Sequence, residues 1–204
     1  MQNELQPIGD LAFVQVQAQP LKTSGPDNPY YNPANLVVVQ EVRLSPFGVV
    51  GVGADGERIL DAHHADHPRS RFGGSNGISV GFIGHYDRMR TRFGDPLPDG
   101  AAGENLIVSG PDAPKPEDLA GRLIFENPDG SRFEFRLVKA MAPCQEFSHY
   151  VNRSSGTLPA GVLKDTLQFL DGGTRGYALE LVGAEEAWLV PGARLFRIKL
   201  SKNS

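Results

Sequence analysis

The clearest structural signal in the sequence is RLIFENPDGSRFEFRLV, residues 122–138. Two runs that carry apolar residues flank Asn127-Pro128-Asp129-Gly130, a tetrapeptide whose residue types favour a tight turn. In the second run Phe133, Phe135 and Leu137 alternate with charged or polar positions, so they share one face of a strand. The stretch therefore predicts a β-hairpin with one buried face.

Short extended segments recur on both sides of this hairpin. They show period-two alternation or β-branched runs, and they lie at 14–17, 36–39, 41–44, 48–53, 78–83, 177–182, 187–190 and 194–200. Helical spacing of apolar residues occurs at 85–93 and 163–170, and residues 23–34, with three prolines, predict a long loop. Many short strands with two helices predict a mainly β fold, a closed or partly closed barrel with short flanking helices.

Composition limits the classes of protein that this chain can belong to. With 204 residues, 40% hydrophobic content and 22% charged content, it fits one ordered domain. We expect residues 1–34 to form a strand and loop packed on a barrel of residues 35–204. A formal net charge of −4 argues against nucleic-acid binding, and no apolar run is long enough for a membrane span. We therefore expect a cytoplasmic protein without nucleic-acid or membrane partners.

A single cysteine, Cys144, follows the hairpin's return strand in Met141-Ala142-Pro143-Cys144-Gln145. Proline ends sheet pairing, so the thiol is predicted at a strand end, where functional sites are commonly built. One cysteine cannot form an internal disulfide. Two alternatives remain from the residues alone: a small buried apolar side chain, or a reactive thiol.

Two glycine-containing segments are candidates for ligand contact. Gly103-Glu104-Asn105-Leu106 precedes an apolar strand start and presents a carboxylate and an amide that could bind a heterocycle; the alternative is a local turn. Residues 71–77, which include Gly73 and Gly74, could bring backbone N–H groups to an anion. This second segment lacks the lysine and helix of a phosphate loop, so an ordinary turn is the alternative.

Three of the five histidines lie close together between Asp61 and His67. His64, Asp66 and His67 resemble part of the metallo-β-lactamase HxHxDH site, which would make a zinc hydrolase. Ala62 stands where that motif needs its first histidine, and metal affinity depends on the number of ligands. We therefore predict that this cluster is not a complete zinc site.

The order of these segments resembles the MOSC domain, the C-terminal module of molybdenum cofactor sulfurases that also occurs as stand-alone bacterial proteins. Residues 103–106 match the family's GENL motif, and Pro143-Cys144 matches its Pro-Cys motif. Partial matches are Asp61-Ala62-His63, residues 72–80 with Phe72 in place of a histidine, residues 173–178, and 191–193 with Ala193 in place of an aspartate. Met141-Ala142 stands where the family has an arginine before Pro-Cys. The resemblance spans about residues 35–200.

The resemblance implies a β-barrel that holds the molybdenum cofactor (molybdopterin), and at family level it also implies pyridoxal phosphate binding. Cys144 would ligate molybdenum or carry sulfur as a persulfide, since a thiolate is a soft ligand. The cofactor-binding residues that it implies are Gly103, Glu104, Asn105, Gly73, Gly74, His63 and Arg175. Among these, Glu104 and Asn105 would hold the pterin or order the loop, and Arg175 would offset phosphate charge.

Three functional hypotheses follow. The first is an oxidoreductase that acts on N-hydroxylated small molecules or bases with a Cys144-ligated molybdenum. The second is a non-catalytic module that carries sulfur or cofactor to an acceptor protein, and the third, less favoured, is the zinc hydrolase. The sequence has no flavin or iron–sulfur motif, so the first hypothesis requires an electron-donor protein as a partner.

Overall fold

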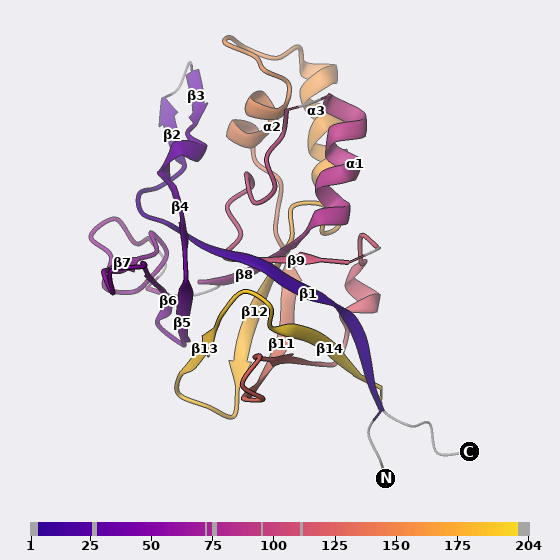
Figure 1. The fold of residues 1–204 in the computed structure, drawn as a ribbon. Helices are drawn as coiled ribbons and strands as arrows, with labels where there is room; N and C mark the ends of the chain where they lie inside the picture. The colour runs from indigo at the N-terminus through magenta and orange to yellow at the C-terminus, as the bar shows by residue number, and fades with distance from the viewer. Residues whose placement is uncertain are drawn as a thin grey trace.

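The structure, a computed structural model, describes residues 4–25, 28–71, 73–74, 77–94, 96–110 and 112–199. Within this part of the chain, seven strands close into a barrel in the order β14-β10-β11-β12-β8-β9-β1, and the pairing of β1 with β14 completes the ring (Figure 1). These strands are β1 (Glu4–Gln17), β8 (Ile78–Phe82), β9 (Leu106–Ser109), β10 (Arg122–Glu126), β11 (Arg132–Ala140), β12 (Tyr177–Val182) and β14 (Arg194–Lys199). The predicted hairpin is β10–β11, and the predicted mainly β, barrel-type fold is confirmed.

A second sheet packs beside the barrel in the order β13-β5-β6-β7. Its strands are β5 (Glu41–Ser45), β6 (Gly48–Val52), β7 (Arg58–Leu60) and β13 (Ala187–Leu189). The neighbouring strand β4 (Leu36–Val39) instead extends the barrel sheet, because it pairs with the last four residues of β1. The two adjacent segments 36–39 and 41–44 therefore belong to different sheets, which their similar sequence patterns did not distinguish.

The prediction of a long loop at residues 23–34 is wrong in part. The chain there forms a two-stranded hairpin, β2 (Lys22–Gly25) with β3 (Asn28–Tyr31), followed by a 3-10 turn at Pro33–Asn35. Each strand pairs on one side only, so Pro29 can sit in β3 without interrupting a second ladder. Pro26 lies outside the described residues.

Strand β1 is one of the strands of the barrel. The sequence had led us to expect that residues 1–34 pack on a barrel formed by residues 35–204. It pairs with β14 at its beginning, β9 in its middle and β4 at its end. The register shifts between Pro7 and Gly9 and again between Leu11 and Phe13. These bulges break the period-two pattern, so only residues 14–17 were recognised from the sequence.

Three α-helices gather with β2 and β3 at one end of the barrel (Figure 1). They are α1 (Ile83–Phe93), α2 (Gln145–Val151) and α3 (Ala160–Leu170), and a 3-10 turn lies at Pro116–Asp118. The sequence predicted α1 and α3 but missed α2, which has seven residues and buries the polar Ser148 and His149 beside Phe147 and Val151. Across the described residues, no helix has the length and apolar character needed to cross a lipid bilayer.

The chain has two hydrophobic cores, one inside the barrel and one under the helices. In the barrel, Phe125 and Phe135 of the predicted hairpin meet edge to face with ring centroids 5.5 Å apart. The second core packs Tyr86 and Met89 of α1 against Phe147 of α2 and Tyr31 of β3. The helices and the β2–β3 hairpin therefore share a core of their own at that end of the barrel.

His85 is a buried titratable side chain at the start of α1, between the rings of Phe82 and Tyr177. Its Nε2 lies 3.0 Å from the carbonyl oxygen of Pro114, while Nδ1 has no hydrogen-bond partner among the described residues. Since the carbonyl can only accept, the neutral ring carries its proton on Nε2. Burial lowers the pKa of His85 to about 4, because a second ring proton would be unsolvated.

We predict that the fold loses stability as the pH falls from 6.5 to about 4. The unfolded chain protonates His85 near pH 6.5 and the folded chain only near pH 4, so below pH 6.5 the unfolded state binds more protons. The loss over this window is roughly 3 kcal/mol from His85 alone. Urea unfolding at pH 7 and pH 4.5 should show this slope, and His85→Phe should flatten it.

The control is Tyr177→Phe, which removes the other hydrogen bond to Pro114 O without removing an imidazole. This variant should keep the pH slope of the wild type. An unchanged slope in His85→Phe would show that the acid sensitivity arises elsewhere.

Candidate functional site

A cavity of about 610 Å³ lies at the end of the barrel where β2, β3 and α2 approach it. Its wall carries five side chains that are cationic at neutral pH: Lys22, Arg69, Arg71, Lys139 and Arg175. Glu104 and Glu146 are the carboxylates among the wall residues. On a chain with a formal charge of −4, this excess of positive charge favours an anionic ligand. The volume is that of a small-molecule site.

Two glutamines of β1 hold the backbone of the segment that carries the GENL motif. Gln15 Nε2 donates to the carbonyl oxygens of Gly100 and Glu104, each at 2.8 Å, and Gln17 Nε2 donates to Gly103 O at 2.8 Å. Gly103 has a φ of +97°, and a Cβ there would lie 2.8 Å from Gln17 Nε2. Glycine is therefore required at 103 by both the backbone conformation and the close approach.

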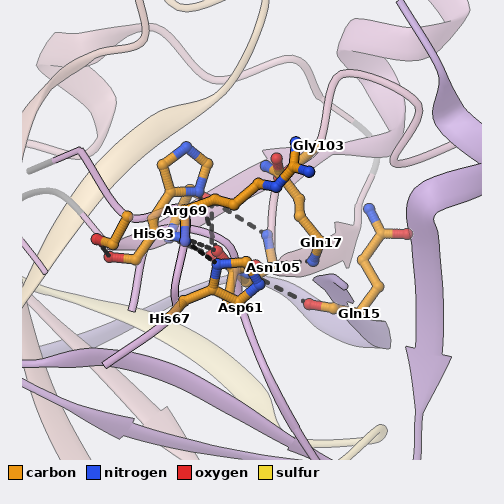
Figure 2. Close-up of polar contacts among 10 residues, drawn as sticks. Gln15, Gln17, Asp61, His63, His67, Arg69, Gly103 and Asn105 are labelled. Atoms are coloured by element: carbon orange, nitrogen blue, oxygen red, sulfur yellow. Dashed lines mark hydrogen bonds and ion pairs between the residues drawn. The ribbon is translucent and has the colours of Figure 1, made fainter. Parts of the chain in front are cut away.

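Asn105 is buried, and its side chain is fully occupied by hydrogen bonds within the protein. Its Nδ2 donates to Asp61 Oδ2 at 2.9 Å and to Gln15 O at 3.3 Å, and its Oδ1 accepts from Ser79 Oγ at 2.8 Å and from Ser79 N at 3.2 Å (Figure 2). No donor or acceptor of this amide is left for a ligand. Of the two roles expected for Asn105, the geometry supports ordering the loop.

Glu104 is 2% exposed and lines the cavity. Its Oε2 accepts a 2.5 Å hydrogen bond from Tyr86 Oη, which in turn accepts from Ala102 N, and its Oε1 has no partner among the described residues. Burial raises the pKa of this carboxyl, against the opposing effects of the Tyr86 hydrogen bond and the Arg175 charge. The site therefore disfavours an ionised Glu104.

Arg175 connects the cysteine segment to the GENL segment. Its Nη1 donates to Ala142 O at 3.0 Å and lies 3.4 Å from Cys144 Sγ, and its Nη2 donates to Ala102 O at 3.1 Å. The guanidinium also lies over the ring of Phe147, 4.8 Å from its centroid, while Nε is buried and has no partner in the described part of the chain. A buried cation with one free donor is thus held between Cys144 and the cavity.

Cys144 is half-buried at the N-cap of α2 and is not itself a wall residue of the cavity as described. Its neighbours Met141, Ala142 and Glu146 do line it. Arg175, which lines the cavity, contacts Cys144 Sγ and so places the thiol next to the wall. Five of the predicted residues, His63, Gly103, Glu104, Asn105 and Arg175, belong to the wall.

His63 reaches the cavity from the loop that follows β7. Its backbone N and its ring Nδ1 both lie 2.9 Å from Asp61 Oδ1, and its side chain is 44% exposed. Asp61 itself has no exposed surface. The imidazole is therefore held at Nδ1 by Asp61, on a side chain that is partly exposed (Figure 2).

The predicted glycine loop contributes less to the cavity than expected. Gly73 and Gly74 have φ values of +56° and +88°, and a Cβ on Gly74 would lie 2.6 Å from Phe47 O. Gly74 therefore serves close backbone packing, and among the described loop residues Arg71 and Gly77 line the cavity. Phe72, Ser75 and Asn76 lie outside the described residues.

The neighbouring histidines are used in local turns. His64 Nδ1 accepts from Asp66 N and His67 Nδ1 accepts from Arg69 N, both at 3.1 Å. Over the residues that the structure describes, no three histidine, cysteine, aspartate or glutamate side chains are grouped so as to hold a metal ion. The rings of His64 and His67 instead stabilise the turns that carry the chain from Asp61 to Arg69.

Several residues that line the cavity or hold its wall in place were not identified from the sequence. Gln15 and Gln17 were recognised only as the polar positions of an alternating strand, yet both are buried. Tyr31 lies in the stretch that was predicted as a loop. Lys139 lies near the end of a predicted strand, at a position that no motif marks. The alternation of two glutamines with valines in 14–17 was a usable signal, because amides on a buried strand require backbone partners.

Comparisons with known proteins concern the family and the fold of the chain. The family model of the MOSC domain matches residues 69–193. The crystal structure of the YuaD protein from Bacillus subtilis superposes with a TM-score of 0.57 at 14% identity, over 96% of this chain and 97% of that one. The structure of YiiM from Geobacillus stearothermophilus gives a TM-score of 0.47 at 15% identity, over 97% of this chain and 76% of that one. No curated protein matches the sequence significantly.

We predict that Glu104→Gln stabilises the fold relative to the wild type increasingly as the pH rises from 4.5 to 7.5. Because burial raises the folded-state pKa of Glu104 above its ordinary value of 4.5, the folded chain holds a proton that the unfolded chain has lost, and stability declines with pH. Glutamine carries no such proton. Urea unfolding of both proteins across this range measures the difference.

Glu57→Gln, the same substitution on an exposed loop, controls for the loss of one carboxyl from the chain. A constant difference between Glu104→Gln and the wild type at every pH would contradict the expected burial effect.

Proposed function

The chain belongs to the MOSC domain family, and from this membership we propose that it binds the molybdenum cofactor in the cavity and reduces N-hydroxylated small molecules or bases there. The family is associated with binding of this cofactor. The observation that carries the proposal is the position of Arg175, which contacts Cys144 Sγ on one side and the carbonyl of Ala102 on the other. One buried side chain thereby joins the Pro-Cys motif to the residue that precedes the GENL motif.

The donor set fits the cofactor on three counts. Cys144 offers a thiol 3.4 Å from a permanent cation, and such a cation stabilises negative charge on sulfur, the form that binds a soft metal. The unpartnered Nε of Arg175 and Oε1 of Glu104 are buried polar atoms that a ligand can satisfy. The cations of the cavity wall suit a group that carries a phosphate.

Each residue has a distinct part in the proposed activity. Cys144 would hold the metal, and Lys139 with Arg69 would neutralise the anionic end of the cofactor. Asn105 keeps the loop and β8 in place, since its own hydrogen bonds are filled. Glu104 offers a carboxyl that burial keeps from ionising readily and that is therefore able to donate a hydrogen bond.

The bound cofactor would supply two-electron redox chemistry at the metal. The protein's contribution is to orient the substrate, to limit water in the cavity and to manage protons. Cys144 is the single cysteine of the chain, so no iron–sulfur cluster can be held by its own thiolates. Electrons for turnover therefore come from a donor protein.

The proposal is tested on protein expressed in a host that makes the molybdenum cofactor. We expect about one molybdenum per chain in the wild type by elemental analysis, and loss of most of it in Cys144→Ser, because serine is nearly isosteric but a far poorer soft-metal ligand. The thermal stability of Cys144→Ser should change by no more than about 1–2 kcal/mol. Zinc should be measured in the same samples.

A matched pair of substitutions on β11 tests whether the positive charge of the cavity wall contributes to cofactor binding. Lys139→Gln removes a cation from the cavity wall, whereas Arg136→Gln removes one that pairs with Glu180 outside it. Molybdenum content should fall in the first variant and stay at the wild-type level in the second. Zinc without molybdenum in the wild type would contradict the proposal, and a persulfide on Cys144 without molybdenum would favour the carrier function.

A further inference from the structure

The pair Asp61–His63 is a feature of the cavity that cofactor binding does not require. The Asp61 carboxylate has no exposed surface and accepts four hydrogen bonds: from Gln17 N, from Asn105 Nδ2, and from the backbone N and ring Nδ1 of His63. All four are donated to it, which is the pattern of an ionised carboxylate. Its position is fixed by β1 and by the GENL segment as well as by its own loop.

This arrangement decides which nitrogen of His63 carries the proton in the neutral ring. An ionised Asp61 cannot donate, so Nδ1 must be the N–H that meets Oδ1 at 2.9 Å. Nε2 is then the nitrogen that carries the lone pair, on a side chain that is 44% exposed. A histidine fixed at Nδ1 by a buried carboxylate is arranged for proton transfer at Nε2.

The other titratable side chains of the cavity wall are less suited to that task. Lysine and arginine side chains remain protonated near neutral pH. Burial raises the pKa of Tyr31 well above its ordinary value, and its hydroxyl already donates to Ala101 O. Glu104 is enclosed with Oε2 bound to Tyr86. Within the described wall, His63 and Glu146 both combine a place on the cavity with partial exposure, and His63 is the one that is held by the buried Asp61 carboxylate.

We propose that His63 is the proton donor for cleavage of the substrate's N–O bond, and that Asp61 is its positioning residue; this rests on the function proposed above. The reduction R–NH–OH + 2 H⁺ + 2 e⁻ → R–NH₂ + H₂O breaks the N–O bond, and the bound molybdenum cofactor would supply the electron pair. The imidazolium form of His63, which carries a proton on Nε2 as well as on Nδ1, gives its Nε2 proton to the departing oxygen, which leaves as water, and the ring becomes the neutral Nδ1–H tautomer. The second proton reaches nitrogen from solvent, and the imidazole is reprotonated through its exposed face.

The substitution that isolates this role is His63→Asn. The side-chain amide of asparagine can replace Nδ1–H as donor to Asp61 Oδ1, so the buried network is kept, but it has no counterpart of Nε2. The control is His67→Asn, in which the amide oxygen replaces Nδ1 as acceptor for Arg69 N, on a ring that does not line the cavity. Both variants exchange one histidine for asparagine in the same loop.

The kinetic test uses 6-N-hydroxylaminopurine as substrate and dithionite-reduced viologen as electron donor. We expect His63→Asn to keep its molybdenum and its KM while kcat falls about 100-fold to 10,000-fold, the usual contribution of general acid catalysis. His67→Asn should turn over like the wild type. In His63→Ala, added imidazole should restore part of kcat, because the vacated space opens to solvent.

The spectroscopic test needs no turnover. Long-range ¹H–¹⁵N spectra of the full chain, assigned with His63→Asn, should show the Nδ1–H tautomer for His63, since Asp61 holds that proton. The Nε2–H tautomer would overturn the proposal, and so would a loaded, fully active His63→Asn. Loss of activity in both His63 variants without imidazole rescue would assign His63 a packing role. A wild type without molybdenum would instead refute the proposed function, and the His63 role with it.

Discussion

The Asp61 carboxylate sits with no solvent contact at the point where β1, the loop after β7 and the GENL segment meet. A charge so placed is tolerable only when its lone pairs are satisfied, and here four donors converge on it. The same carboxylate therefore fixes the course of β1, the amide of Asn105 and the ring of His63. The cavity wall depends on this one buried group, because removing it would take away the acceptor of Gln17 N and one of the two acceptors of Asn105 Nδ2.

Closure of the barrel imposes a second constraint that acts through β1. This strand contacts β14, β9 and β4 in succession, and two bulges let it bend enough to do so. Gln15 and Gln17 lie near the end of this strand and are buried, and their side-chain amides donate to carbonyl oxygens of the GENL segment. The N-terminal residues are thus part of the candidate site, although no motif lies in them.

The cavity also shows how positive potential can arise on an acidic chain. Its wall cations come from β2, from the loop after β7, from the end of β11 and from the segment before β12. None of these segments is strongly basic by itself. Convergence of separate strand ends concentrates the charge, and burial of Arg175 places one cation where solvent cannot screen it. An anionic ligand is therefore favoured here over the rest of the surface.

By itself, the sequence determined the hairpin of residues 122–138, most of the other strands and two helices, because alternation, turn residues and helical spacing act locally. It also identified Cys144 and the GENL motif, whose residue types are specific. It did not determine that β1 closes the barrel, that β2 and β3 form a hairpin, or that Gln15 and Gln17 face inward. Those features depend on which distant strands pair, and only the tertiary structure decided them. The same holds for the contact between Arg175 and Cys144, which joins residues 31 positions apart through packing that no local pattern encodes.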